Sequence, residues 1–299
     1  MDPDLVDVAL TPFERDQPAV HAVSQWEQAI ASLREDESRR SLVIDGYYDD
    51  PLLEAAKRYH ASAEWQAILG LLPKGGDALD VGAGRGIATY ALAHSGFRVT
   101  ALEPDSSDLV GAGAIRRLAL DADFQVEVIQ ENSEFLPVAD SQFDLVFARA
   151  VLHHTSDLSS ACREFARVLR PGGILVAVRE HVISRPEHLQ AFLDTHPLHH
   201  LYGGENAFLL QDYTSAIQLA GLVLEQVLAP FESPINYAPR SEAELRAELS
   251  RRIGARLFRS QTLIEGFLRL DSVWKPLRTL LSHFDHRPGR LYSFVARKP

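Results

Sequence analysis

Three alternating glycines form the segment of this sequence that is richest in chemical information. An apolar stretch runs through them into a helical pattern, as Leu79-Asp80-Val81-Gly82-Ala83-Gly84-Arg85-Gly86. Glycines at such a turn permit tight backbone geometry and close approach of a ligand. The helix that follows would present unpaired N–H groups beside that ligand. The segment therefore predicts a strand, a ligand-binding turn and a helix.

Two acidic residues accompany this turn. Asp80 immediately precedes the glycines, and Glu103 ends the next apolar stretch, Arg98 to Leu102. An acid roughly 20 residues beyond a glycine turn accepts hydrogen bonds from both hydroxyls of a ribose. A carboxylate beside the ligand suits an amino group and would repel a pyrophosphate. The position of Asp80 and the glycine spacing G-x-G-x-G, in place of G-x-G-x-x-G, both argue against a nicotinamide-dependent oxidoreductase. That class of enzyme is nevertheless the main alternative.

The order of the later segments makes a family resemblance specific. The glycine turn is followed by Glu103-Pro104, Glu131 to Pro137, Phe143 to His154 and Leu169 to Gly173. This series resembles the motifs of class I S-adenosylmethionine (SAM)-dependent methyltransferases. It is most similar to the branch that includes ubiquinone and menaquinone C-methyltransferases and many small-molecule O- and N-methyltransferases. The resemblance covers Leu72 to Arg179 well and is weak outside that span.

The resemblance implies SAM as the cofactor and S-adenosylhomocysteine as the product. It puts the glycines at the methionine part of SAM, Asp80 near the amino group and Glu103 at the ribose hydroxyls. The family commonly has Asp where this chain has Asn132, but an Asn side-chain oxygen can still accept from the adenine amino group. The candidate cofactor-binding residues are Asp80, Gly82, Ala83, Gly84, Gly86, Glu103, Pro104, Asn132, Ser133 and Arg149.

Candidate catalytic residues follow the fourth and fifth predicted strands. Methyl transfer requires the enzyme mainly to align a nucleophile and to remove its proton. Ligands in open α/β sheets bind at the carboxyl ends of the strands, where His154 and His181 are alternative general bases. Arg179 could bind a substrate carboxylate or phosphate, or could pair with Glu180 or another acid at the surface.

A histidine-rich segment, THPLHHLYGGENAF, comes after the fifth strand. Its spacing matches no standard metal signature, although His199, His200 and Glu205 could together bind a divalent metal. The sequence therefore predicts no metal site and favours a lid or substrate-recognition loop, with a packed structural insertion as the alternative. The candidate substrate residues are His153, His199, His200, Tyr202 and Glu205.

Short apolar runs alternate with helical patterns between Asp77 and Glu180. This alternation predicts an α/β, Rossmann-like fold with a mostly parallel seven-stranded sheet and helices on both faces. Residues 1–71 are expected to form a helical N-terminal extension, and residues 72–299 the SAM-binding domain. Insertions are expected after strand 5, at about 181–211, and before the last strand, at about 232–286, where Ser241-Glu-Ala-Glu244 has capping-box spacing.

The composition narrows the class of partner. A net charge of −11 over 299 residues lowers the expectation of nucleic-acid binding. The single cysteine, Cys162, excludes a disulfide framework within the chain and suits a reducing compartment. No secretory signal pattern or membrane-length apolar run is visible. We therefore expect a cytoplasmic methyltransferase that acts on a small molecule and has no nucleic-acid partner and no membrane span. The sequence leaves open whether the chain forms a homodimer. It also leaves open a SAM-binding protein that transfers no methyl group.

Overall fold

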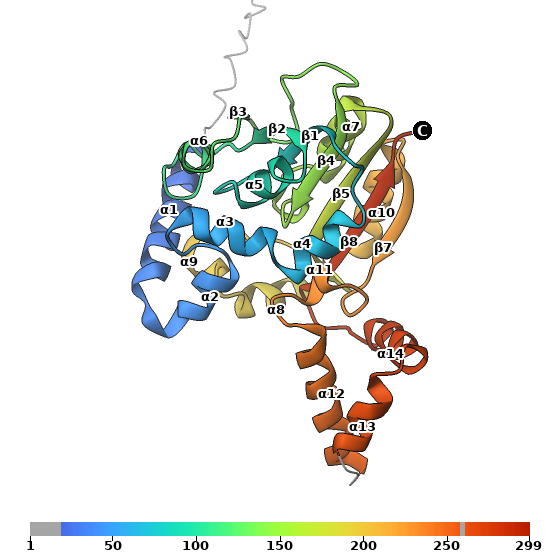
Figure 1. Cartoon of the computed structure of the whole chain (residues 1–299). Helices are drawn as coiled ribbons and strands as arrows, with labels where there is room; N and C mark the ends of the chain where they lie inside the picture. The colour runs from blue at the N-terminus through green and yellow to red at the C-terminus, as the bar shows by residue number, and fades with distance from the viewer. Residues whose placement is uncertain (1–18, 258–260) are drawn as a thin grey trace, which may run out of the picture.

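An eight-stranded sheet forms the centre of the computed structural model, which describes residues 19–257 and 261–299 (Figure 1). The strand order is β3-β2-β1-β4-β5-β8-β7, and the two-residue β6 pairs with β5 beside this path. The strands are β1 Gly76–Val81, β2 Phe97–Leu102, β3 Val126–Ile129, β4 Phe143–Arg149, β5 Leu169–Ile183, β6 Phe208–Leu209, β7 Val223–Leu228 and β8 Arg290–Arg297.

The pairing of the strands confirms a mostly parallel sheet. β1 to β6 pair in parallel, whereas β8 runs antiparallel to both β5 and β7. Helices α5, α6 and α7 cross from β1 to β2, from β2 to β3 and from β4 to β5, as the alternating sequence pattern predicts, whereas residues 130–142 join β3 to β4 without a helix. The described part of the sheet has one strand more than the seven expected, because the short β6 adds to the edge of β5 beyond the point where β4 ends.

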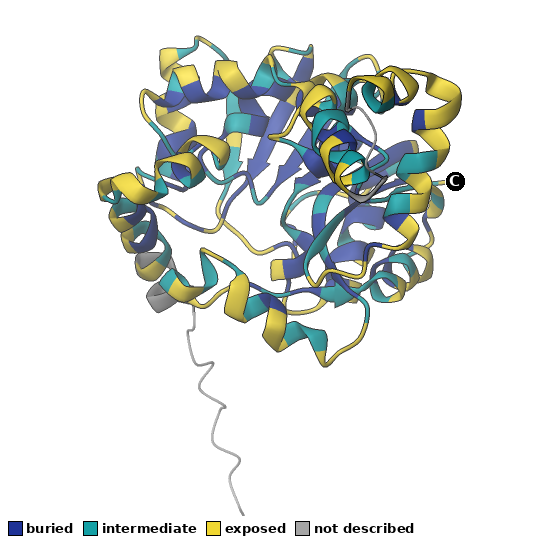
Figure 2. Cartoon of the chain, turned by 90° about the horizontal axis from the view of Figure 1, so that it is seen from below, coloured by how far each residue is buried: buried dark blue, intermediate teal, exposed yellow. Residues whose placement is uncertain are grey.

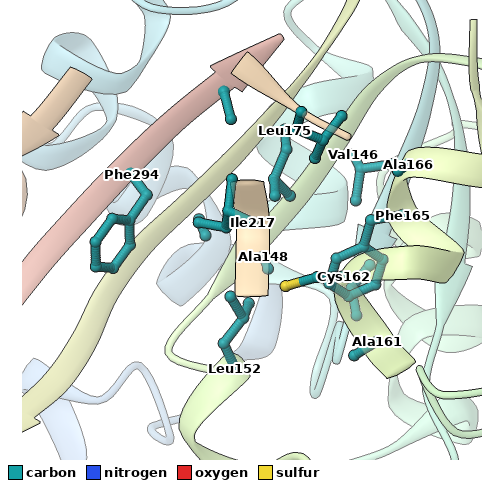
Figure 3. Packing of buried hydrophobic residues seen from close by; sticks show 14 of the residues in the cluster. Val146, Ala148, Leu152, Ala161, Cys162, Phe165, Ala166, Leu175, Ile217 and Phe294 are labelled. Atoms are coloured by element: carbon teal, nitrogen blue, oxygen red, sulfur yellow. The ribbon is translucent and has the colours of Figure 1, made fainter. Parts of the chain in front are cut away.

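Helices cover both faces of the sheet, as expected. Consecutive residues of a buried strand point to opposite faces, so Val146 and Ala148 of β4 join one core while Leu145 and Phe147 join the other. Figure 3 shows the first core, where Phe165 packs against the sheet. The helices are α1 Ala19–Glu35, α2 Arg40–Asp45, α3 Leu52–His60, α4 Ala63–Leu69, α5 Ile87–Ala93, α6 Ala112–Asp121, α7 Leu158–Val168, α8 His188–Thr195, α9 His199–Tyr202, α10 Leu210–Leu219, α11 Pro234–Tyr237, α12 Glu242–Leu257, α13 Gln261–Leu268 and α14 Asp271–His283, with 3-10 turns η1 Glu37–Arg39 and η2 Leu152–His154.

Helices α1 to α4 occupy the described part of the predicted N-terminal extension; residues 1–18 lie outside the described residues. Arg85 of the glycine turn ties this extension to the sheet. Its buried guanidinium donates to the backbone oxygens of Tyr47 at 2.9 Å and Asp49 at 3.1 Å, and to Oδ1 of Asp50 at 2.7 Å. The extension therefore lies against the same turn that the sequence assigns to the cofactor.

Both expected insertions are present. The first contains α8, α9 and β6 and follows β5; the second contains α11 to α14 and separates β7 from β8. In Figure 1, α12 to α14 project away from the sheet. The predicted capping box opens α12: the Ser241 N–H donates to Oε2 of Glu244 at 2.8 Å, and the Glu244 N–H donates to Oγ of Ser241 at 3.2 Å.

Buried residues concentrate in the sheet and in the helix faces that contact it (Figure 2). The α12–α14 insertion has its own small core, formed around the buried Trp274, Leu245 and Leu268. Within the described ranges, no helix combines the length and the apolar composition needed to cross a membrane.

Candidate active site

The glycine turn has the backbone geometry that its sequence predicts. Gly82, Gly84 and Gly86 have φ angles of 60°, 55° and 83°, in the left-handed region that favours glycine. A Cβ on Gly82 would lie 2.7 Å from Cγ2 of Val151, whereas a Cβ on Gly84 would meet no atom nearer than the Val110 oxygen at 3.9 Å. The space beside Gly84 is therefore open, and a ligand could contact its backbone there.

Asp80 and Glu103 are both buried beside this turn. Asp80, the penultimate residue of β1, accepts from the hydroxyl of Thr89 on α5 at 2.6 Å. Glu103, which directly follows β2, accepts from the N–H groups of Gly84 at 2.6 Å and Asp105 at 2.9 Å. Burial raises the pKa of each carboxyl to about 7, although these hydrogen bonds act in the opposite direction. Both groups would be stabilised as carboxylates by a ligand that brings positive charge or hydroxyl donors.

The segment expected to contact adenine follows β3. Asn132 is exposed and Ser133 is buried, while Pro104 on the neighbouring loop is exposed. Glu134 connects this segment to the start of α7, because its Oε1 accepts from the backbone N–H and the hydroxyl of Ser156 at 2.8 and 2.9 Å. This contact fixes the adenine segment relative to the loop after β4.

Arg149 and Arg179 both face one buried acid, Glu64 of α4. Arg149 donates from Nε to Oε1 of Glu64 at 2.6 Å and from a terminal nitrogen to Oε2 at 3.1 Å. Arg179 lies 3.6 Å from the same Oε2 and donates to the backbone oxygens of Ile235 and Ala238 at 2.8 and 3.0 Å. The guanidinium of Arg179 is thus engaged by the extension and by α11, and the surface pairing with Glu180 does not form.

Four histidines and two glutamates gather where β4 and β5 end. His153 is buried; its Nδ1 lies 2.7 Å from Oε2 of Glu180, and its Nε2 lies 3.7 Å from Oε2 of Glu205. His154 is one-third exposed, with Nδ1 2.9 Å from the Gly204 oxygen and Nε2 3.9 Å from the same Glu205 atom. We call His153, His154, His181, His196 and Glu205 the histidine cluster.

The remaining two histidines complete this cluster from the side of β5 and α8. His181 places its ring centroid 4.7 Å from that of His153 and 5.2 Å from that of His196. Nδ1 of His196 lies 3.7 Å from Oε1 of Glu205, an oxygen that also accepts from the Tyr202 hydroxyl at 2.6 Å. Burial lowers the pKa of His153 and of His181 well below the ordinary value, so both rings are neutral at pH 7.

Two of the expected substrate residues do not join this cluster. His200 is exposed, and its Nε2 lies 2.8 Å from the backbone oxygen of Asp194; His199 is half-buried on the same short helix, α9. The two groups of potential metal ligands found among the described residues both contain Glu205, and neither contains His199 or His200. The grouping of His199, His200 and Glu205 considered from the sequence is therefore not formed.

Sequence reasoning did not select three residues that the structure brings to the site. Glu64 lies in the N-terminal extension, 85 residues from Arg149, and nothing in its sequence neighbourhood marks it. Glu180 and His196 belong to segments that drew attention, but their partners could be identified only from the fold. Their one signal in the sequence is the high density of histidine and acid between residues 180 and 205.

The site fits the groups that SAM would present. Asp80 and Glu103 form no ion pair within the described residues, which leaves two buried carboxyls to accept from an amino group and from ribose hydroxyls. The open space beside Gly84 lies next to the second of these acids. Residues 79–177 match the family model described as a methyltransferase domain. The chain contains a methyltransferase domain.

Curated relatives of this methyltransferase domain act on varied molecules. Over 125 residues the chain is 34% identical to the ubiquinone biosynthesis O-methyltransferase of Methylobacterium sp. (strain 4-46), covering 42% of this chain and 47% of that enzyme. Over 182 residues it is 31% identical to the 27-O-demethylrifamycin SV methyltransferase of Amycolatopsis mediterranei (strain S699), covering 59% and 65%. The match thus spans less than two thirds of either relative.

A solved structure extends the comparison of the fold beyond the matched segment. The [4+2]-cyclase SpnF is similar with a TM-score of 0.52 and 22% identity, covering 82% of each chain. At this identity the similarity concerns the fold alone. The methyltransferase domain match covers the glycine turn and most of the sheet from β1 to β5, and the similarity of fold extends over most of the chain.

Proposed function

We propose that this chain transfers the methyl group of SAM to an oxygen, nitrogen or carbon atom of a small molecule. The observation that carries the proposal is the pair of buried carboxyls at the glycine turn: Asp80 in the strand before it, and Glu103, which accepts the N–H of Gly84 beside open space. A pyrophosphate at the glycine turn would be repelled by Asp80, which disfavours a nicotinamide cofactor. The acidic net charge of −11 supports a small molecule over a nucleic acid as the substrate.

When bound, SAM supplies a methyl carbon that is activated by the adjacent sulfonium. Asp80 would accept from the amino group of SAM and Glu103 from its ribose hydroxyls, and the Gly84 backbone would line the same ligand. Asn132 and Ser133 would contact the adenine. Arg149 is already paired with Glu64, so its role would be to fix the extension over the site.

The acceptor would bind on the side of the histidine cluster, which follows β4 and β5. His154 is the better exposed of the two candidate bases, and its Nδ1 faces a carbonyl oxygen, so its Nε2 has a lone pair that can receive a proton. His181 holds its Nδ1 2.8 Å from the Gly289 oxygen in the same way. Burial lowers the pKa of His181 well below its ordinary value, so the ring is neutral and can receive a proton, but as a weaker base than an ordinary imidazole.

Binding of S-adenosylhomocysteine tests the cofactor assignment. We expect a clear rise in melting temperature with S-adenosylhomocysteine and none with NADH, because a ligand at ~100 times its Kd stabilises the folded state by ~2.7 kcal/mol. Asp80→Asn and Glu103→Gln should lose this rise, while Glu127→Gln, an exposed acid on β3, should retain it. Stabilisation by NADH alone, or retention in both site variants, would overturn the assignment.

Turnover must be tested separately from binding, because the fold shared with SpnF also supports a cyclase. Transfer of radiolabelled methyl from SAM to a panel of hydroxylated, amino and carbon-acid small molecules would establish methyl transfer. Full binding with no transfer to any acceptor would instead favour a SAM-binding protein with another activity. The single cysteine, which is buried, suits a cytoplasmic location.

A further inference from the structure

Three lone-pair acceptors converge on one point beside the proposed acceptor site. Oε2 of Glu205 lies 3.7 Å from Nε2 of His153 and 3.9 Å from Nε2 of His154. Glu205 and His153 are 8% and 1% exposed, so water screens these atoms poorly. The other carboxylate oxygen, Oε1, is occupied by the Tyr202 hydroxyl at 2.6 Å. Oε2 is thus the oxygen left for another partner.

The hydrogen bonds at the far side of each ring fix where the ring protons lie. Nδ1 of His154 faces the backbone oxygen of Gly204, which can only accept, so Nδ1 carries the proton. Nδ1 of His153 lies 2.7 Å from Oε2 of Glu180, which also accepts the backbone N–H of His153, and an ionised Glu180 would accept a second hydrogen bond from a protonated Nδ1. In these tautomers each Nε2 has a lone pair on the side of Glu205.

We propose that His153, His154 and Glu205 bind a divalent transition-metal ion. Imidazole nitrogens with one carboxylate suit zinc or ferrous iron and other transition metals that accept mixed nitrogen and oxygen ligands. Ligand atoms ~2.1 Å from one ion lie roughly 3.0–3.4 Å apart at octahedral or tetrahedral angles. The three ligand atoms lie within 4.8 Å of one another, with 3.7 and 3.9 Å from the two nitrogens to Glu205, so ion binding would draw them closer together. The ion would replace the repulsion among three lone pairs by attraction.

The surroundings of these ligands have the form expected around a metal. Glu180 is fully buried and orients His153, as carboxylates commonly do for metal-bound histidine. The Gly204 oxygen orients His154 from the insertion that also carries Glu205. His181 and His196 face the other side of Glu205, where they form a second group of potential ligands with the same carboxylate.

The position of the ion also suggests the acceptor class, an inference that rests on the proposed methyl transfer. Three protein ligands leave coordination positions free, and the partial exposure of His154 puts them on the solvent side. A substrate hydroxyl bound there would lose its proton more readily, and the proton would pass to Nε2 of His181, because Nε2 of His154 would hold the ion. The resulting oxygen would attack the methyl carbon of SAM as the bond from that carbon to sulfur breaks, which releases S-adenosylhomocysteine. We therefore infer that the acceptor is a phenol, enol or alcohol oxygen.

Metal binding by the purified full-length chain tests the site without any substrate. After removal of metal with a chelator, titration with Zn²⁺ should give one ion per chain, and Co²⁺ should develop a visible absorption that Zn²⁺ abolishes. Glu205→Gln and His154→Ala should weaken binding by at least roughly 10-fold; His154 is partly exposed, so this variant should fold. Glu180→Gln, a positioning variant, should weaken binding by roughly 10–100-fold and shift the Co²⁺ spectrum.

His200→Ala is the matched control, because His200 lies on α9 beside the site but faces the Asp194 oxygen. It should bind Zn²⁺ as the parent chain does. Absence of Zn²⁺ and Co²⁺ binding by the parent chain, or equal affinity in Glu205→Gln and His154→Ala, would overturn the proposal. Loss of metal binding in His181→Ala and His196→Ala alone would overturn the assignment of His153 and His154 as ligands. A failed cofactor assignment would appear separately, as absence of stabilisation by S-adenosylhomocysteine.

Discussion

The backbone N–H of Gly84 donates to Oε2 of Glu103 at 2.6 Å, across 19 residues of sequence. This bond joins the turn after β1 to the residue that follows β2, so the glycine that would approach the ligand and the acid that would bind ribose are held together. Asp105 donates to the other oxygen, Oε1, at 2.9 Å. The two donors use only part of the acceptor capacity of the carboxylate, which leaves lone pairs for a ligand.

Affinity for S-adenosylhomocysteine should increase as the pH rises through about 7. Burial raises the pKa of Asp80 and Glu103 to about 7, with the hydrogen bond from Thr89 and the Arg149 charge opposing it at Asp80. The charges of Asp105 and Asp80 act in the same direction as burial at Glu103. A ligand that donates to both acids requires them ionised, so binding releases protons. Calorimetry at pH 6, 7 and 8 in buffers of different ionisation enthalpy would measure this, and a pH-independent Kd would contradict it.

The same shifts predict a pH dependence of stability in the ligand-free protein. The unfolded carboxyls have pKa values of ~3.9 and ~4.3, below the value of about 7 in the folded chain. The folded state therefore holds more protons between pH ~4 and ~7, and this contribution to stability falls as the pH rises through that window. The free energy of unfolding, measured in urea at several pH values for the parent chain and the Asp80→Asn/Glu103→Gln double variant, would isolate this contribution. Equal slopes of that free energy against pH in the two proteins would contradict the assignment.

Substitution of the turn glycines should separate backbone strain from crowding. Gly82→Ala places a Cβ 2.7 Å from Val151 at a φ of 60°, so it should destabilise by roughly 2–4 kcal/mol. Gly84→Ala has a similar φ but open space, so roughly 1–2 kcal/mol is expected. In a Val151→Ala background the cost of Gly82→Ala should fall toward that of Gly84→Ala. Urea unfolding of the parent chain, the two single variants and the double variant measures the coupling energy between residues 82 and 151. Strictly additive changes in unfolding free energy would exclude the contact with Val151 as the cause of the destabilisation.

Removal of Glu64 should destabilise the fold strongly. Burial alone would raise its pKa, but the charges of Arg149 and Arg179 hold that pKa below its ordinary value. Glu64→Ala leaves these two guanidinium groups without their shared buried anion, for which about 3–5 kcal/mol of unfolding free energy is expected. The control is Glu54→Ala, whose solvent-exposed pair with Lys57 should contribute little to stability. Similar unfolding midpoints for both variants would contradict the prediction.

His154→Ala should separate cofactor binding from turnover. His154 touches the Gly204 oxygen and faces Glu205, whereas the candidate cofactor contacts lie at Asp80 and Glu103. The variant should therefore keep the S-adenosylhomocysteine Kd of the parent chain within about 2-fold, while methyl transfer falls roughly 10²-fold or more. Isothermal titration and a methyl-transfer assay measure the two quantities. Full turnover would remove His154 from the catalytic residues.

The sequence by itself determined the sheet, the glycine turn and the insertions. These features depend on local patterns: strand residues are apolar in short runs, the glycines take φ values that other residues disfavour, and Ser241 and Glu244 lie within one helical turn. The acid after β2 could be identified because the strand–turn–helix–strand unit places residues at a nearly fixed separation.

Only the tertiary structure decided which residues meet at the carboxyl ends of the strands. The pairing of Arg149 with Glu64 joins β4 to the extension, and the pairing of Glu180 with His153 joins β5 to the turn after β4. His199 and His200 looked like partners of Glu205 because they are near it in sequence. The short helix α9 instead directs Nε2 of His200 toward the Asp194 oxygen. Long-range pairing depends on how layers pack, and local residue spacing does not specify it.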